Sequence, residues 1–135
     1  MLGESVIKLE HYEVRILVRK ATQNGNAKKV MLGKYIEDSP LSYNARAGKD
    51  HTFFEMKDEL WREVSQKVNN DHKEIWKINK QFIDEQFKQK KDFFLSHNPE
   101  NQKGFYFDEI DYLTGTNNLK GKIIRINETL WKIEF

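Results

Sequence analysis

The sequence predicts an α+β fold: N-terminal helices, a small twisted and mostly antiparallel sheet, and a C-terminal hairpin, in one domain of residues 1–135. Three observations lead to this class. An amphipathic pattern over residues 72–90 is typical of a helix. Short apolar runs at 51–56 and 92–98 are typical of buried strands, and the chain closes with two alternating runs around Asn127-Glu128, which indicates a hairpin.

The N-terminal half is predicted element by element. Residues 8–22 fit both helical spacing and strand alternation, and we favour a helix. The β-rich run 29–36 is followed by a loop over 39–48, which contains one of the two prolines. After the strand 51–56, Asp58 is suited to capping a helix. The apolar positions of that helix are Leu60, Trp61, Val64 and Val68.

The C-terminal half begins with the helix 72–90. One face of this helix carries Ile75, Ile78, Phe82, Ile83 and Phe87, and lysine, glutamine and aspartate lie on the other. The buried strand 92–98 ends in polar residues. Pro99 and Gly104 bracket a turn before a helix that carries Phe107, Ile110 and Leu113. No repeat, low-complexity tract or Pro/Gly-rich linker divides the chain.

The composition is that of one folded domain. The chain has 135 residues, 38% hydrophobic and 33% charged, with nine Phe, five Tyr and three Trp, which a disordered chain would lack. There is no apolar run near the length of a membrane span and no signal-peptide pattern, so we expect no stable membrane association. The absence of Cys excludes disulfides and thiolate metal sites. A formal net charge of +2 indicates a mixed surface and is not by itself a nucleic-acid signature.

The triplet Lys49-Asp50-His51 stands at the entrance to a predicted strand. Because neighbouring strand residues point to opposite faces, Lys49 and His51 project together. A lysine beside a histidine disfavours the imidazolium, which leaves the ring neutral and able to act as a base. The ammonium would stabilise an anion that develops during phosphodiester cleavage. The alternative is a surface loop in which His51 caps a backbone group.

A second polar group, Ser96-His97-Asn98, follows the other buried strand. Strand ends are where α/β proteins usually place functional groups, although these residues would also suit a turn ahead of Pro99. We expect the strands 51–56 and 92–97 to be antiparallel. That arrangement would bring both polar ends to one edge of the sheet and form an acid–base pair from His51 and His97.

Other patterns give weaker indications of a functional site. The pattern Glu55-x-Lys57 occurs in metal-dependent nucleases, but it arises by chance in a chain this charged, and we expect neither a metal nor a cofactor. His11 and His72 have no partner at ligand spacing and are interpreted as surface residues. The three tryptophans occupy amphipathic positions and are interpreted as core; they are Trp61, Trp76 and Trp131.

Several phrases of the sequence resemble the C-terminal toxin modules of bacterial polymorphic toxins, which are carried on Rhs-repeat, contact-dependent-inhibition or LXG-type proteins. These phrases are KVMLGKY, SPLSYNARAGKDHTFFEM, EIWKINKQFIDEQ, FFLSHNP, EIDYL and a final LW, spread over about 20–135. Many such modules are metal-independent ribonucleases of the barnase/EndoU/colicin/RelE-like group, with a few helices followed by a twisted antiparallel sheet. The resemblance implies a domain secreted or delivered by the producing bacterium that acts in the target-cell cytoplasm.

The leading hypothesis is therefore a toxin that cleaves RNA without a metal. His51 and His97 would exchange the protons of the reaction and Lys49 would stabilise the developing charge. Arg46 would hold the scissile phosphate in a bidentate contact. The remaining substrate-binding candidates are Tyr43, Ser96 and Asn98.

Two other classes remain open. An NAD-consuming or ADP-ribosyltransferase toxin would hold its dinucleotide with Tyr43, Arg46 and Glu109. A non-enzymatic phage or plasmid binding protein would use its polar runs to contact a partner. Under the toxin hypothesis the producing cell needs a cognate immunity protein, which we expect to be acidic and to cover Lys49, Arg46 or the lysines of 88–91.

Overall fold

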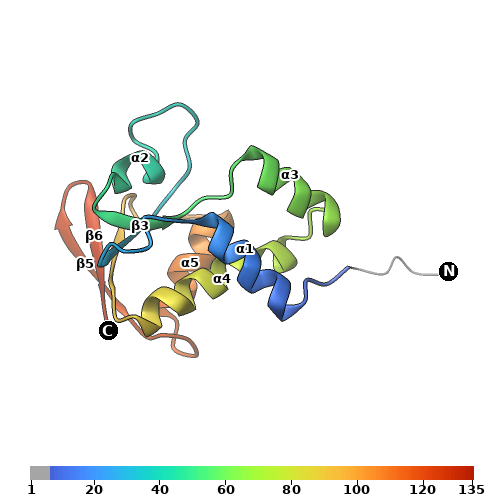
Figure 1. Cartoon of the computed structure of the whole chain (residues 1–135). Helices are drawn as coiled ribbons and strands as arrows, with labels where there is room; N and C mark the ends of the chain where they lie inside the picture. Colours follow the sequence, from blue (N-terminus) through green and yellow to red (C-terminus); the bar gives the residue numbers. More distant parts are fainter. Residues whose placement is uncertain (1–6) are drawn as a thin grey trace.

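Helices and strands alternate along residues 7–135, the part of the chain that the computed structural model describes (Figure 1). The predicted α+β class is confirmed. The helices are α1 (His11–Ala21), α2 (Tyr43–Ala47), α3 (Asp58–Lys67), α4 (His72–Lys88) and α5 (Gly104–Thr114). The strands are β1 (Thr22–Gln23), β2 (Lys29–Leu32), β3 (His51–Phe54), β4 (Asp92–Leu95), β5 (Lys122–Asn127) and β6 (Leu130–Glu134).

The six strands form one mixed sheet in the order β1-β3-β2-β4-β6-β5. The central strand β2 pairs in parallel with β3 on one side and with β4 on the other. The outer pairs, β1–β3, β4–β6 and β5–β6, are antiparallel, which includes the predicted C-terminal hairpin. Parallel neighbours require long crossovers. Here α2 connects β2 to β3, and α3 with α4 carries the chain back across β2 to β4.

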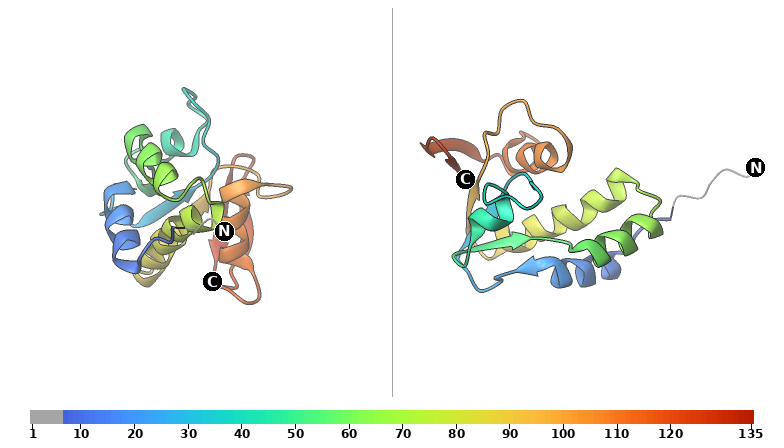
Figure 2. Two further views of the ribbon diagram at one scale, coloured as in Figure 1. Left: turned by 90° about the vertical axis from the view of Figure 1, so that its right-hand side faces the viewer. Right: turned by 90° about the horizontal axis from the view of Figure 1, so that it is seen from above.

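One face of the sheet forms the core because alternate strand residues point to it. These residues are Val30, Leu32, Thr52, Phe54, Phe93, Leu95, Trp131 and Ile133, all buried. Helix α4 packs here through Phe82, whose ring centroid lies 5.5 Å from that of Phe54. Helices α1 and α5 contact α4, while the short α2 contacts β2 and β3. Figure 2 shows the helices α1, α3 and α4 extending away from the sheet on one side.

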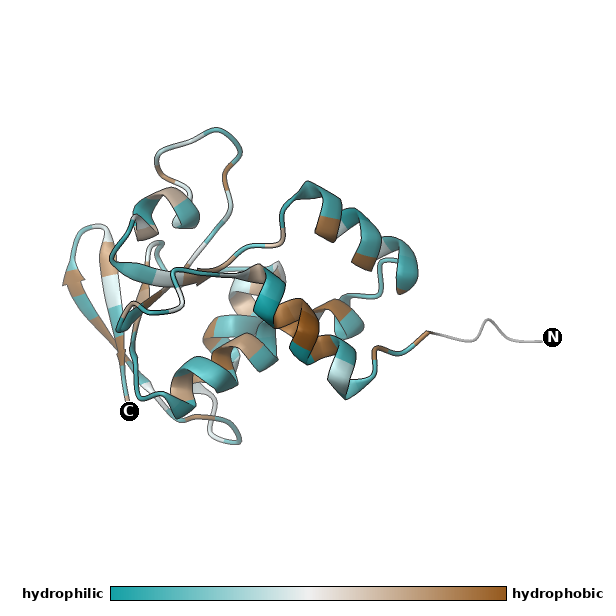
Figure 3. Cartoon of the chain, in the orientation of Figure 1, coloured by the Kyte–Doolittle hydropathy of each residue, from teal (hydrophilic) through white to brown (hydrophobic). Residues whose placement is uncertain are grey.

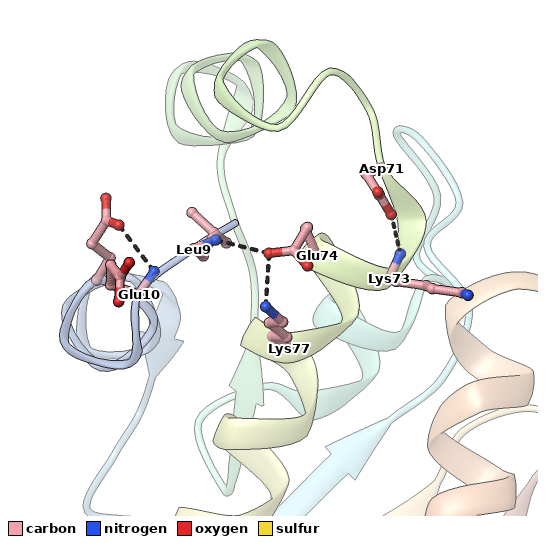
Figure 4. A network of polar contacts seen from close by, with 7 residues as sticks. Leu9, Glu10, Asp71, Lys73, Glu74 and Lys77 are labelled. Atoms are coloured by element: carbon pink, nitrogen blue, oxygen red, sulfur yellow. Dashed lines mark hydrogen bonds and ion pairs between the residues drawn. The ribbon is translucent and has the colours of Figure 1, made fainter. Parts of the chain in front are cut away.

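The start of α4 is tied to the start of α1 by a small polar network (Figure 4). Asp71 caps α4 by accepting a hydrogen bond from the Lys73 amide at 2.9 Å. The buried carboxylate of Glu74 accepts a hydrogen bond from the Leu9 amide and another from Lys77 Nζ, both at 2.8 Å. A buried carboxylate requires such partners, so Glu74 is structural.

Three local expectations differ from the structure. The ambiguous segment 8–22 contains a helix, as favoured, but its last residue begins β1. The expected loop 39–48 contains α2, whose five residues are too few to show a periodicity. Asp58 is the first residue of α3 and its cap position is Lys57. Among the described residues no helix is both long enough and apolar enough to cross a membrane.

Candidate functional site

A crevice lies at the carboxyl ends of the parallel strands β2 and β3. Gly33 and Lys34 follow β2, and residues 55–58 follow β3. The opposite wall comes from α4 and α5, and the cavity has a volume of about 580 Å³. The crevice therefore lies outside the carboxyl ends of two parallel strands. In α/β sheets this is the side on which ligands bind.

Aromatic rings form much of the crevice wall. They are Tyr35, Tyr43, Phe54, Trp61, Phe105 and Tyr106. Trp61 meets the edge of Phe105 at a centroid distance of 6.3 Å, and the other neighbour of Phe105 is the His72 ring, stacked at 4.2 Å. Trp61 is 42% exposed, so it belongs to the wall of the crevice and not to the core as predicted.

Two tyrosines fix the inner end of the crevice. The hydroxyl of Tyr43 donates to the carbonyl oxygen of Phe54, and that of Tyr106 donates to the carbonyl oxygen of His97. Burial, followed by the neighbouring charge of Glu109, raises the pKa of both hydroxyls far above the ordinary range. Both groups therefore stay protonated and act as fixed parts of the wall.

Glu109 is the unusual group of the crevice. Its side chain is buried on α5, and no residue of 7–135 forms an ion pair with it. Burial, with a smaller effect of the Asp108 charge, raises the pKa of this carboxyl to about 8. A buried acid whose pKa is moved towards neutrality inside a cavity is a typical functional group.

The crevice carries a net negative charge only when Glu109 is ionised, that is, near and above its pKa of about 8. Four acids line it, Glu37, Glu55, Asp58 and Glu109, against three lysines, Lys34, Lys57 and Lys103. Glu55 accepts a hydrogen bond from Asn44 at 3.1 Å. The lysines and Asp58 are exposed, whereas Glu109 is buried. Once Glu109 is ionised, the interior therefore favours a cation, while the lysines of the rim can contact an anion.

The expected pair of His51 and His97 is not assembled, and the antiparallel arrangement predicted for their strands is wrong. Both β3 and β4 run parallel to β2. His51 lies beside Lys29, which in turn pairs with Asp92 at the beginning of β4, whereas His97 follows the end of β4. The long crossover through α3 and α4 produces this direction. The two histidines consequently lie at opposite ends of the parallel strands, His51 at the start of β3 and His97 just after the end of β4.

His51 instead occupies the sheet face on the side of α2. Its Nδ1 hydrogen-bonds the Ala47 carbonyl oxygen at 3.0 Å, and its ring meets the edge of Phe94 at 5.7 Å. Burial lowers the pKa of His51, and the charges of Lys29 and Arg46 act in the same direction. The neutral state expected from the sequence therefore has a physical cause here. Lys49 is exposed in the loop before β3, away from the crevice lining.

The other predicted site residues mostly support the crevice from outside. The Arg46 guanidinium donates to the Ser96 carbonyl oxygen, so it joins α2 to the end of β4. Ser96 Oγ lies 2.7 Å from His97 Nδ1, which also accepts the Lys34 amide at 3.2 Å. Asn98 caps the following turn through the Glu100 amide at 3.0 Å. Of the predicted substrate-binding residues, Tyr43 alone lines the crevice.

Asn79 carried a signal in the sequence that was overlooked, and Glu109, named from the sequence for a dinucleotide only, carried a stronger one than was used. Tyr106, Glu109, Ile110 and Leu113 share one buried face of α5, and Asn79 lies among the buried apolar residues of α4. A carboxyl or amide within such a stripe is costly unless it has a task. The spacing could have assigned Glu109 and Asn79 to a site, since both line the crevice.

Together, these observations describe an α+β domain with a crevice at the carboxyl ends of the parallel strands β2 and β3. Comparison of the sequence and the structure with family models, curated proteins and solved structures found no match. The chemistry of the crevice is therefore the basis for a proposed function.

Proposed function

We propose that the protein is a toxin module that hydrolyses the N-glycosidic bond of an NAD-type dinucleotide in the crevice. One observation carries the proposal: Glu109 is a buried carboxyl without an ionic partner in residues 7–135, and it lines a cavity walled by aromatic rings. A ligand that is both aromatic and cationic satisfies the two features at once, because π faces and a carboxylate both attract a cation. The nicotinamide ring of NAD is such a group.

The remainder of the dinucleotide suits the outer part of the site. A cavity of about 580 Å³ lies within the range of nucleotide-sized ligands. Its exposed lysines, Lys34, Lys57 and Lys103, supply the positive charge that a pyrophosphate requires. The crevice also lies outside the carboxyl ends of parallel strands, the side of the sheet on which nucleotide-binding α/β folds hold their ligands.

The reaction needs little from the protein. The bond between ribose C1′ and the ring nitrogen breaks, both electrons pass to the nitrogen, and nicotinamide leaves as a neutral molecule. The ribosyl cation that remains is stabilised by the Glu109 carboxylate. Water then adds to C1′ and releases one proton to solvent. Because the leaving group needs no protonation, one carboxylate suffices, and no pair of histidines is required.

Release of nicotinamide tests the proposal. Purified protein is incubated with NAD, and nicotinamide is quantified by chromatography; we expect turnover that is lost in Glu109→Gln. Glu63→Gln is the matched control, since Glu63 is exposed on α3 and lies outside the crevice lining. Absence of nicotinamide release from the folded wild-type protein would sink the proposal.

RNA cleavage remains a second candidate because of the sheet face beside α2. There the ring of Phe94 has the ammonium groups of Lys29 and Lys132 at 6.0 and 5.9 Å from its centroid, next to His51. An aromatic ring flanked by cations can stack a base and hold phosphate, and a neutral histidine can act as a base.

Incubation with total RNA in EDTA tests this candidate. If it is correct, RNA is degraded by the wild-type protein and by Glu109→Gln, and His51→Gln stops the degradation. Intact RNA with the wild-type protein would remove the candidate.

A further inference from the structure

Strand β5 is open to solvent on both faces and along one edge. All six of its residues are exposed, including Ile123 (38%), Ile124 (39%) and Ile126 (48%). It is the last strand in the sheet order, so its outer edge pairs with no other strand of residues 7–135. Apolar segments in the hairpin are visible as brown ribbon at the margin of the molecule in Figure 3.

This exposure is not what a sheet edge usually shows. Proteins protect edge strands with charges, bulges or covering segments, since free backbone groups recruit other strands. β5 has one irregularity, between Arg125 and Asn127, and two charged residues. Three exposed isoleucines nevertheless remain. A short strand that is apolar on both faces and unpaired along its edge has the properties of a site for an added strand.

A cleft beside β5 offers room for the side chains of such a strand. It has a volume of about 560 Å³, and its walls include Ile123, Arg125 and Trp131. The Arg125 guanidinium lies 5.8 Å from the centroid of the Trp131 ring. Asn98 and Pro99 close the other side of the cleft. An apolar side chain could therefore enter beside Ile123 and Trp131 on this face while the backbone pairs along the edge.

The charges of β5 favour an acidic partner strand over a second copy of β5. Both charged residues of β5, Lys122 and Arg125, are basic, and Lys120 precedes the strand. No ion pair is formed by any of the three within the described chain. Three acids lie beside the strand: Glu134 is opposite Lys122 on β6, and Glu100 and Glu128 line the cleft together with Arg125. Antiparallel pairing of two β5 strands would crowd like charges, whereas an acidic strand would complement them.

We propose that β5 is a docking edge for an extended segment of a partner protein in which apolar and acidic residues alternate. The segment adds a seventh strand to the sheet. This surface is separate from the crevice, and the proposal does not depend on the reaction carried out there.

Selection from a random library of short linear peptides displayed on phage tests the proposal. The wild-type protein is the bait, and binders that are retained by an Ile124→Lys/Arg125→Glu double variant are removed. We expect the enriched peptides to be acidic with alternating apolar residues. A synthetic copy should slow hydrogen exchange of the amides in 122–127, and N-methylation of alternate peptide backbone nitrogens should abolish this protection.

Single variants of β5 are expected to lower the affinity for the selected peptide by a measurable factor. Ile124→Lys and Arg125→Glu should each weaken the peptide at least about tenfold, as is typical of central interface residues. The matched control Ile16→Lys, on α1 and 45% exposed, should leave the affinity unchanged. Failure to enrich any peptide, enrichment of basic peptides, or protection outside 122–127 would overturn the proposal. Self-association of the wild-type protein that Ile124→Lys abolishes would assign the edge to a second copy and overturn it equally.

Discussion

Replacement of Glu109 by glutamine should stabilise the protein while it removes the proposed reaction. The reason is the cost of ionising a buried carboxyl. The pKa of Glu109 is about 8 in the folded protein against an ordinary value of 4.5. Between these values the unfolded chain carries an ionised Glu109 and the folded chain a protonated one. The folded state then binds the extra proton, so its stability falls as pH rises.

The size of the effect follows from this interval. Each pH unit between the two values costs roughly 1.4 kcal/mol, so at pH 7 the wild-type protein should have lost about 3 kcal/mol relative to pH 4.5. Glutamine resembles the protonated acid and cannot ionise. The difference in unfolding free energy between Glu109→Gln and the wild type should thus be near zero at pH 4.5 and grow to about 3 kcal/mol at pH 7.

Urea unfolding followed by tryptophan fluorescence measures this difference across pH, with the denaturation slope as a check on two-state behaviour. Glu63→Gln, which changes an exposed carboxyl on α3, should give a curve parallel to the wild type. If Glu109→Gln also remains parallel to the wild type, Glu109 is ionised in the folded state. Glu109 would then lack the raised pKa expected of a buried acid without an ionic partner.

Three further changes test separate parts of the site. Gly33→Ala would place Cβ 1.8 Å from Ser96 Oγ and 2.8 Å from Tyr43 Cβ, so a loss of about 1–3 kcal/mol is expected in urea unfolding; unchanged stability would show that the wall can move. Trp61→Ala removes an exposed part of the aromatic wall and should raise KM for NAD about threefold to tenfold at constant kcat; a fall in kcat alone would contradict its role in binding. His51→Gln should leave nicotinamide release unchanged, since His51 lies outside the crevice lining, and lost release would move the site to the α2 side of the sheet.

Periodicity predicted the elements of the fold well where a long pattern met clear ends. The stripe along 72–90 became α4, and Asp71 caps it through a hydrogen bond that sequence can anticipate. The strand runs and the terminal hairpin were also found. The direction of β4 relative to β3 was not, because two apolar runs flanked by polar residues look the same in either direction. Only the path of α3 and α4 across the sheet determines it.

The site was harder to predict because the sequence shows which groups are reactive and not which ones meet. His51 and His97 were chosen for their chemistry, and both have a lowered pKa, yet the sheet separates them. Tyr43, Arg46 and Glu109 were named together for a dinucleotide; Tyr43 and Glu109 line one cavity, whereas Arg46 lies outside its lining.

Glu109 is the group of the crevice whose pKa lies closest to neutral pH, because burial raises it to about 8. The Tyr43 and Tyr106 hydroxyls have a pKa raised by burial and donate to backbone carbonyls, so they neither gain nor lose charge there. The proposed reaction needs the ionised carboxylate, and its rate at low NAD should rise as pH approaches 8. Stability should fall over the same interval, for the same reason. A purely structural acid would produce the second trend without the first, so opposite slopes of activity and stability, both removed by Glu109→Gln, would assign this residue to the reaction.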